Sequence, residues 1–277
     1  MNCYATVGQV REKLNTSTTL DASVLACLEA ASRAVDAASG RNGTTEGFWI
    51  ETGVRYFSGD CGGIRQGRMY IDECLALTEI AEDTGADATY STVWDNITDY
   101  LLAPANTYPK CYVELHQNSA QSLGFGKRRY KLTGTWGYGD GTSNPWKSAG
   151  VTGTVATTSG TALTLSAAGA PAIDAGHTLK IDTEQLFVES VSGTTATVTR
   201  AVNGTTAATH TTAAVYIAQY PRDVVLASMW FAIEMWKNMQ SAGLSGERIG
   251  NYSYTTATPE ITEQQKRRML GRVQRWA

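Results

Sequence analysis

The chain has 277 residues, of which 18% are charged, and its formal net charge at pH 7 is −3. This balance does not suggest a protein that coats nucleic acid, because such proteins are normally basic. No run of about 18 apolar residues exists, so we expect no membrane-spanning segment, and the N-terminus lacks the apolar core of a signal peptide. The five cysteines are widely spaced without a C-x-x-C pair. We therefore expect neither a zinc site nor a disulfide framework, and folding in a reducing cytoplasm.

Two helices are predicted before residue 41. Thr6 and Gln9 have the spacing of a capping box at the start of the first helix. Asp21 is expected to cap a second, longer helix that is rich in alanine and ends at Gly40. The alanines make this helix slim and suited to close packing against another helix.

Between Val54 and Tyr138 the pattern changes to short segments of strand-forming residues, separated by Gly, Asp and Asn. This pattern predicts a small antiparallel sheet joined to the first helices, with a hairpin formed by residues 88–90 and 93–94. An apolar anchor is expected at residues 48–50. The predicted strands are at residues 55–57, 69–71, 75–77, 100–103, 111–115 and 128–138.

A composition shift follows, and from Ser148 to Ala218 nearly every segment is a Thr, Val and Ala strand that ends in a glycine turn. Ser192-Gly193 and Asn203-Gly204 supply two of these turns. No apolar stripe of helical length occurs here, so the pattern predicts an all-β insert of roughly 70 residues, near the lower limit for independent folding. Its strands are predicted at residues 154–156, 162–165, 178–181, 186–188, 195–199 and 215–217.

A helix is predicted from Tyr220 to Gly243. Pro221 suits its first turn, and Asp223 favours the positive end of the helix dipole. The helix is apolar over more of its circumference than one packing partner needs, so it is either central to a core or packed on a second chain. We expect its surplus, Trp230 and Trp236, to contact a neighbouring subunit. A glycine-rich loop follows, at residues 243–254, and then a last helix from Thr258.

Together these patterns predict an α+β fold, consisting of a small helical bundle with an antiparallel β-sheet plus an inserted all-β domain. The first domain is discontinuous and comprises residues 1–146 and 220–277, whereas the inserted domain comprises residues 147–219.

Catalytic signals are weak. The three histidines, His116, His177 and His210, lack the spacing of metal ligands, and no serine-hydrolase, P-loop or kinase motif is present. The adjacent acids at 72–73 and 82–83 would point to opposite faces of a strand. Two carboxylates facing each other across a cleft, as glycosidases require, remain open. We expect no enzyme activity, cofactor or metal.

Four cations gather at Lys127, Arg128, Arg129 and Lys131. They are either a solvated strand edge that charge protects from pairing, or a surface that faces DNA.

Three segments appear in a telling order: Tyr4-Ala5-Thr6 with an alanine-rich helix that ends near Ser39-Gly40-Arg41, then Thr133 to Tyr138 (TGTWGY), then Pro221-Arg222-Asp223-Val224. This order resembles the head–tail connector proteins of long-tailed phages, which are also called adaptor or head-completion proteins. The sequence departs from that pattern by placing about 70 residues between the second and third segments.

The insert has a resemblance of its own. Gly176 to Ile181, Glu184, Arg200, Asn203 to Ala208 and His210 are similar to a small β-module that recurs in phage structural proteins.

The connector resemblance implies a non-catalytic virion protein in the phage neck, made in the cytoplasm of the host bacterium. It implies a homo-oligomeric, dodecameric ring under the portal protein. A tail or stopper protein would bind the far side, and DNA would pass through the lumen with non-specific contact. Two alternatives remain open: another phage virion protein, such as a tail-completion or decoration protein, and a carbohydrate-active enzyme with a β accessory module.

The end of the last predicted helix combines basic and apolar side chains, and Arg and Trp are favoured anchors at interfaces. We hypothesise that residues 258–277 dock on the portal. The portal-binding candidates are Arg267, Arg268, Met269, Arg272, Val273, Arg275 and Trp276.

Overall fold

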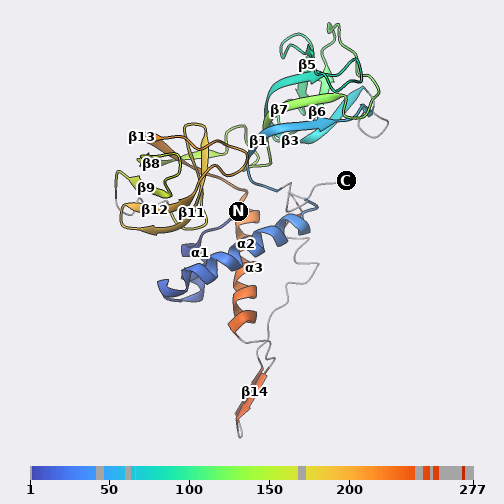
Figure 1. Ribbon diagram of the computed structural model, residues 1–277. Helices are drawn as coiled ribbons and strands as arrows, with labels where there is room; N and C mark the ends of the chain where they lie inside the picture. The colour runs from blue at the N-terminus through green and yellow to red at the C-terminus, as the bar shows by residue number, and fades with distance from the viewer. Residues whose placement is uncertain are drawn as a thin grey trace. The chain divides into compact units, whose positions relative to one another are not determined.

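The computed structural model describes residues 2–41, 47–59, 64–65, 67–167, 173–240, 246–249, 252–255 and 270–271. The chain forms two compact units, which are drawn in Figure 1. The first contains Met1–Gly47, Trp146–Val202 and Thr206–Ala277, and the second contains Phe48–Pro145 and Asn203–Thr205.

The first unit begins with helix α1 (Val7–Leu14), a short 3-10 helix (Thr18–Leu20) and helix α2 (Asp21–Ala38). The predicted capping box is present, because Thr6 Oγ accepts from the Gln9 backbone and the Gln9 side chain accepts from the Thr6 backbone. The prediction that Asp21 caps α2 is wrong. Leu20 occupies the cap position without a side-chain bond, and the Asp21 carboxylate instead pairs with the Arg11 guanidinium at 2.6 Å.

Helix α3 (Arg222–Gln240) packs against α2, although the two helices are far apart in sequence. Small side chains lie at their contact, where the buried hydroxyls of Ser32 and Ser228 are 3.1 Å apart. A close approach of this kind needs residues without bulk, and the alanine-rich sequence of α2 provides them.

The loop before the barrel strand β10 (Thr178–Ile181) is hydrogen-bonded to the first turn of α1. The Val7 N–H donates to the Ala175 carbonyl at 2.9 Å, and the Gly8 N–H donates to Asp174 Oδ2 at 2.6 Å. A carboxylate at this position also complements the positive end of the helix dipole. These bonds join α1 to the barrel, and both belong to the first compact unit.

The barrel is closed, and its six strands pair in the order β10-β11-β12-β9-β8-β13, all antiparallel. All six strands predicted from the sequence are confirmed, and so is the all-β character of the segment. Apolar side chains such as Leu163, Leu179 and Ile181 fill the interior. The strands are β8 (Trp146–Val155), β9 (Ala162–Leu165), β10 (Thr178–Ile181), β11 (Glu184–Ser192), β12 (Thr195–Thr199) and β13 (His210–Ala218).

The second unit is a seven-stranded antiparallel sheet in the order β1-β7-β3-β6-β5, with β2 and β4 also paired to β3. Its buried face holds one apolar cluster, in which Trp136, Tyr130 and Leu132 are fully buried. The strands are β1 (Glu51–Phe57), β2 (Ile64–Arg65), β3 (Arg68–Glu82), β4 (Thr92–Val93), β5 (Tyr100–Ala103), β6 (Lys110–Leu115) and β7 (Tyr130–Trp136).

Two details of this sheet differ from the prediction. The segments 69–71 and 75–77 belong to one long strand, β3, whose pairing with β6 and β7 shifts register near Cys74. The hairpin predicted from residues 88–90 and 93–94 is wrong, because Val93 in β4 pairs with Ala81 at the end of β3. The apolar anchor at residues 48–50 is confirmed, since all three side chains are buried.

Mixed helices and antiparallel sheets are thus confirmed, whereas a small helical bundle is not. The described residues form three α-helices, and most of their regular structure is β. The discontinuous domain predicted at residues 1–146 and 220–277 is divided between the two compact units, because the helices group with the barrel. The loop predicted at residues 243–254 contains a strand pair instead, β14 (Gly246–Ile249) with β15 (Tyr252–Thr255).

Candidate interaction surface

Helix α3 exposes apolar side chains one turn apart. Leu226 is 40% exposed and Trp230 is 54% exposed, while Val224, Ala227 and Phe231 are buried on the inner side of the helix. Residues four apart lie on the same side of a helix, so Leu226 and Trp230 form one apolar ridge. We call this pair the α3 ridge.

Trp236 does not belong to this surface. It is only 4% exposed in the single chain, so it has little area to offer a neighbouring subunit. The expectation that both tryptophans contact a neighbour therefore needs correction for Trp236, whereas for Trp230, which is exposed, it stays a prediction. A wide apolar stripe in the sequence shows that a helix has two apolar sides. It does not show which of the two sides carries each large side chain.

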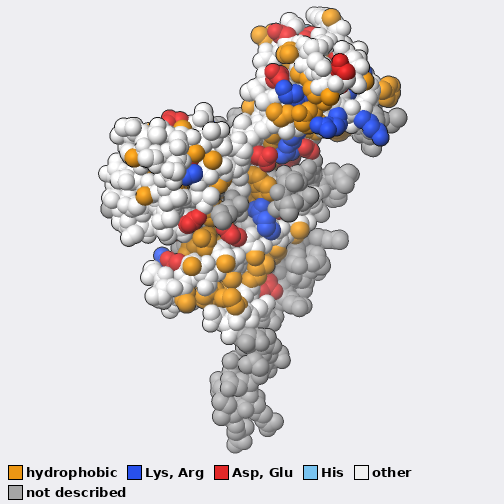
Figure 2. Space-filling model, viewed as in Figure 1, with side chains coloured by type: hydrophobic (Ala, Val, Ile, Leu, Met, Phe, Trp, Pro, Cys, Tyr) orange, Lys and Arg blue, Asp and Glu red, His pale blue; other side chains and the backbone are white. Residues whose placement is uncertain are grey.

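The outer side of α2 exposes alanines next to the partly exposed Glu29 and Arg33. Ala22, Ala26 and Ala30 are exposed and recur at intervals of four residues. Figure 2 shows apolar side chains gathered along this helical part of the first unit.

The hypothesised portal-binding residues, Arg267, Arg268, Met269, Arg272, Val273, Arg275 and Trp276, lie outside the described residues. Of the predicted C-terminal helix only residues 270–271 are described, and Leu270 is buried.

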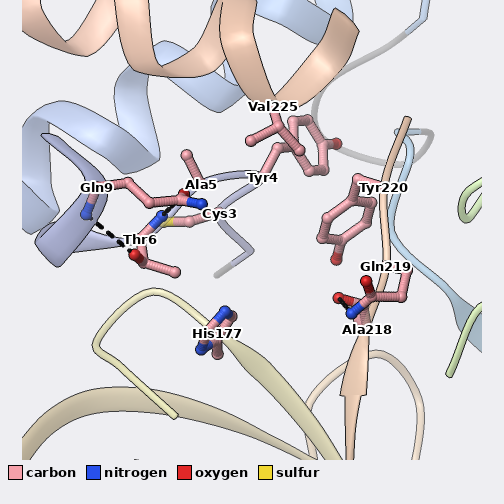
Figure 3. Close-up of a pocket in the computed structure, with 10 residues that line it drawn as sticks. All are labelled: Cys3, Tyr4, Ala5, Thr6, Gln9, His177, Ala218, Gln219, Tyr220 and Val225. Atoms are coloured by element: carbon pink, nitrogen blue, oxygen red, sulfur yellow. Dashed lines mark hydrogen bonds between the residues drawn. The ribbon is translucent and has the colours of Figure 1, made fainter. Parts of the chain in front are cut away.

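A small cavity of about 120 Å³ lies in the first unit, between the N-terminal segment, the start of α3 and the barrel (Figure 3). Cys3, Thr6 and Gln9 line it from one side, and His177 and Tyr220 line it from the others. Thr6 and Gln9 are already engaged in the capping box. The Tyr220 hydroxyl is buried and has no hydrogen-bond partner at ordinary geometry. The Thr178 hydroxyl is nevertheless close enough to affect the pKa of Tyr220.

The cavity pairs a thiol with an imidazole, which is the set of groups found in cysteine nucleophiles. Burial, however, raises the pKa of the Cys3 thiol far above its ordinary value, and only a thiolate is nucleophilic. Burial also lowers the pKa of His177 to about 4, and its Nδ1 accepts a hydrogen bond from the Asp174 N–H. Both groups are therefore neutral near pH 7.

A buried charge cluster closes one part of the barrel. Glu184 is fully buried and accepts two hydrogen bonds from the Arg200 guanidinium, at 2.7 and 2.6 Å. The backbone N–H groups of Ala201 and Ala208 also donate to it, and His210 Nε2 lies 2.8 Å from its carboxylate. Burial opposes ionisation of Glu184, but these partners outweigh it and hold its pKa at about 2. The cluster fastens the loop between β12 and β13, and its three side chains are buried.

The remaining polar candidates are engaged in structure. Asp72 pairs with Arg55 at 2.8 Å, and Glu82 pairs with Arg129 at 2.7 Å. His116 accepts a hydrogen bond from a backbone N–H in its own turn. Within the described residues, no three His, Cys, Asp or Glu side chains converge on a possible metal position.

Comparisons of the chain with protein-family models, with curated proteins and with solved structures find no match. None of the helices in the described part of the chain combines the length and apolar character that crossing a lipid bilayer requires.

The barrel cluster and the α3 ridge differ in how visible they are in the sequence. Trp230 stood out as surplus to the core. The partnership of Glu184, Arg200 and His210 was not foreseen, because the three residues are separated in sequence and meet only after the barrel closes. One signal was available in the sequence: Glu184 and Arg200 occur within a segment that is otherwise apolar and rich in Thr. Glu and Arg are rarely buried unless they are paired.

Proposed function

We propose that the chain is a structural virion protein, a head–tail connector (adaptor) subunit. In this proposal it forms a dodecameric ring under the portal, links the capsid to the tail or stopper protein and lets DNA pass. The observation that carries the proposal is the α3 ridge, because a half-exposed tryptophan next to an exposed leucine is a typical anchor for another protein chain.

The ridge suits a ring for a geometric reason. The ridge consists of two bulky side chains, whereas α2 exposes the small side chains of Ala22, Ala26 and Ala30, which could receive them from a second copy. A contact between two different surfaces of identical subunits is heterologous, and repeated copies then close into a ring or extend as a filament. Twelve individually weak contacts to a portal add through multivalency, so no single strong site is needed.

The test is assembly with purified portal protein. The chain is expected to join portal rings in a complex of matching symmetry, measured by native mass spectrometry and by imaging of the virion neck. Binding to the capsid lattice with no affinity for the portal would refute the connector assignment and favour a decoration protein.

The ridge can be tested within the same assay. We expect Trp230→Ala to weaken ring formation at least tenfold while the melting temperature of the subunit stays the same. Leu20→Ala is a matched control, because Leu20 is also an exposed apolar side chain but lies outside the ridge. Equal loss in both variants would show that the ridge is not the subunit contact.

The C-terminal hypothesis needs a separate variant. Removing residues 258–277 would also remove the buried Leu270, so loss of binding could reflect damage to the fold. The variant R267A/R268A/R272A/R275A leaves Leu270 in place. It is expected to abolish portal binding while the subunit remains folded by circular dichroism, and undiminished portal binding would exclude these arginines as the docking site.

A further inference from the structure

The cations of the second unit divide into two groups. Most of them are engaged, either with a carboxylate or with backbone carbonyls. Among the side chains that the structure describes in this unit, Lys127 and Arg128 are the two cations without such a partner, and both are exposed. The engaged cations are Arg55 with Asp72, Arg68 with Glu114, Arg129 with Glu82, Lys131 with Glu79, and Lys110 with the carbonyls of Pro104 and Ala105.

Aromatic side chains lie beside one of these two cations, Arg128. The Arg128 guanidinium stacks over the Tyr56 ring, 4.4 Å from its centroid. The Tyr90 ring lies 5.5 Å from the Tyr56 ring, and Phe125 is 73% exposed nearby in the chain. We call Tyr56, Tyr90, Lys127 and Arg128 the basic–aromatic corner.

The corner is rigidly built. The Tyr90 hydroxyl donates to the Arg128 carbonyl at 2.7 Å, and the Arg128 N–H donates to Ser58 Oγ at 3.1 Å. The Gly59 N–H also donates to the Gly126 carbonyl at 2.7 Å. These bonds hold Arg128 in the left-handed region, with φ +51°, which costs a non-glycine residue about 1–2 kcal/mol. The backbone at Arg128 is thus held in one conformation, from which the guanidinium stacks on Tyr56.

A second cluster in the same sheet provides a comparison. Arg68 stacks over Tyr112 at 4.7 Å, and Tyr70 lies beside Tyr112, so its geometry resembles that of the corner. The difference is charge, because Arg68 Nε is 2.6 Å from Glu114 Oε1. An arginine neutralised in this way has little attraction for an anion, whereas Arg128 keeps its whole charge.

We propose that the basic–aromatic corner binds the phosphate backbone of DNA. Unpaired cations supply the sequence-independent attraction to phosphates, and the Tyr56 ring supports the Arg128 guanidinium from one side. The inference rests on the proposed function in one respect, which is the choice of DNA as the polyanion that binds. Because the chain carries a net charge of −3, binding by one subunit is weak and steeply dependent on salt.

The experiment is an anisotropy titration of a labelled 30-base-pair duplex with the full chain. Two phosphate contacts predict a slope of about −1.8 for log K against log salt concentration, which is about a 25-fold loss of affinity between 25 and 150 mM salt. The variant K127A/R128A is expected to bind at least tenfold more weakly with a slope near zero. R128G is a second variant, since glycine accepts the left-handed backbone without strain.

Two controls separate the corner from general charge effects. K147A/R222A removes two exposed cations of the first unit, and R68A/E114Q removes the neutralised cluster, so both should bind DNA as the wild type does. Wild-type affinity in K127A/R128A, or equal losses in the controls, would overturn the proposal. No DNA binding by the wild-type chain at 25 mM salt would do so too, and equal competition by polyglutamate would overturn the choice of nucleic acid.

Failure of this inference is distinguishable from failure of the proposed function. Ring formation with the portal is measured without DNA, and K127A/R128A is expected to assemble normally.

Discussion

Removing the Arg200 side chain is the strongest single test of what stabilises the barrel. It donates two hydrogen bonds to the buried Glu184 and others to the carbonyls of Thr157 and Gly160, at 3.1 and 2.9 Å. In Arg200→Ala, Glu184 would remain buried without its cation. Breaking a buried ion pair from one side costs about 3–5 kcal/mol, because the other charge is left uncompensated.

Hydrogen exchange followed by mass spectrometry measures this loss within the intact chain. We expect amides of β11 and β13 to exchange about two to three orders of magnitude faster in Arg200→Ala, since each 1.4 kcal/mol is about a factor of ten. Arg222→Ala, which removes an exposed cation, serves as the control and should change the exchange of these strands little. An effect of Arg200→Ala below about 1 kcal/mol would refute the reasoning, since only exposed ion pairs contribute so little.

The same cluster predicts an acid dependence. The pKa of Glu184 is lowered from 4.5 to about 2 in the folded chain, so folding favours the ionised form. The contribution is complete above pH 4.5 and is lost as the pH falls from 4.5 towards 2, with a magnitude of about 3 kcal/mol. Arg200→Ala should flatten the dependence of barrel stability on pH in this window.

Three further predictions concern single residues. Burial lowers the pKa of His177 from 6.5 to about 4. The fold should therefore be most stable above pH 6.5 and lose about 1–3 kcal/mol as the pH falls towards 4. His177→Asn should remove this dependence of stability on pH in thermal melts. Gly137→Ala should destabilise the sheet by at least 2 kcal/mol in urea denaturation, because φ is +117° and a Cβ would lie 2.0 Å from the Trp49 carbonyl oxygen. Trp236→Ala should cost about 3–5 kcal/mol in the same assay, whereas Trp230→Ala should cost under about 0.5 kcal/mol, and equal losses would contradict the assigned burial.

Local patterning was enough to find most strands and helices. The insert strands were recognisable because Thr, Val and Ala favour extended backbone and glycine turns separate them. The capping box at Thr6 and Gln9 was recognisable because its partners are three residues apart. Features with partners close in sequence were therefore predicted well.

Features with distant partners were not. The closure of the barrel depends on β8 pairing with β13, and these strands are separated by the whole of the insert. Asp21 has the composition of a cap, but Arg11 competes for its carboxylate. The long strand β3 looked like two strands because Asp72 and Glu73 interrupt its apolar residues, and Asp72 is held there by Arg55.

The candidate surfaces follow the same division. The excess of apolar residues on α3 was visible in sequence, but the orientation that buries Trp236 and exposes Trp230 is set by packing against the rest of the unit. The cation cluster at residues 127–131 was visible too. Which of its members are neutralised depends on Glu79 and Glu82, which reach it only through the pairing of β3 with β7.

The pairing of the first and last barrel strands has a consequence for the modularity of the chain. Trp146 and Ala218 are direct partners across β8 and β13, and paired residues in antiparallel strands have Cα atoms about 5 Å apart. The polypeptide thus enters and leaves the barrel at neighbouring points. A turn of a few residues could join Pro145 to Gln219 without moving either end, so the barrel has the connectivity of an exchangeable cassette. Excising it would leave the first turn of α1 without the Asp174 carboxylate that accepts from the Gly8 N–H, and a replacement module would have to supply an acid at that place.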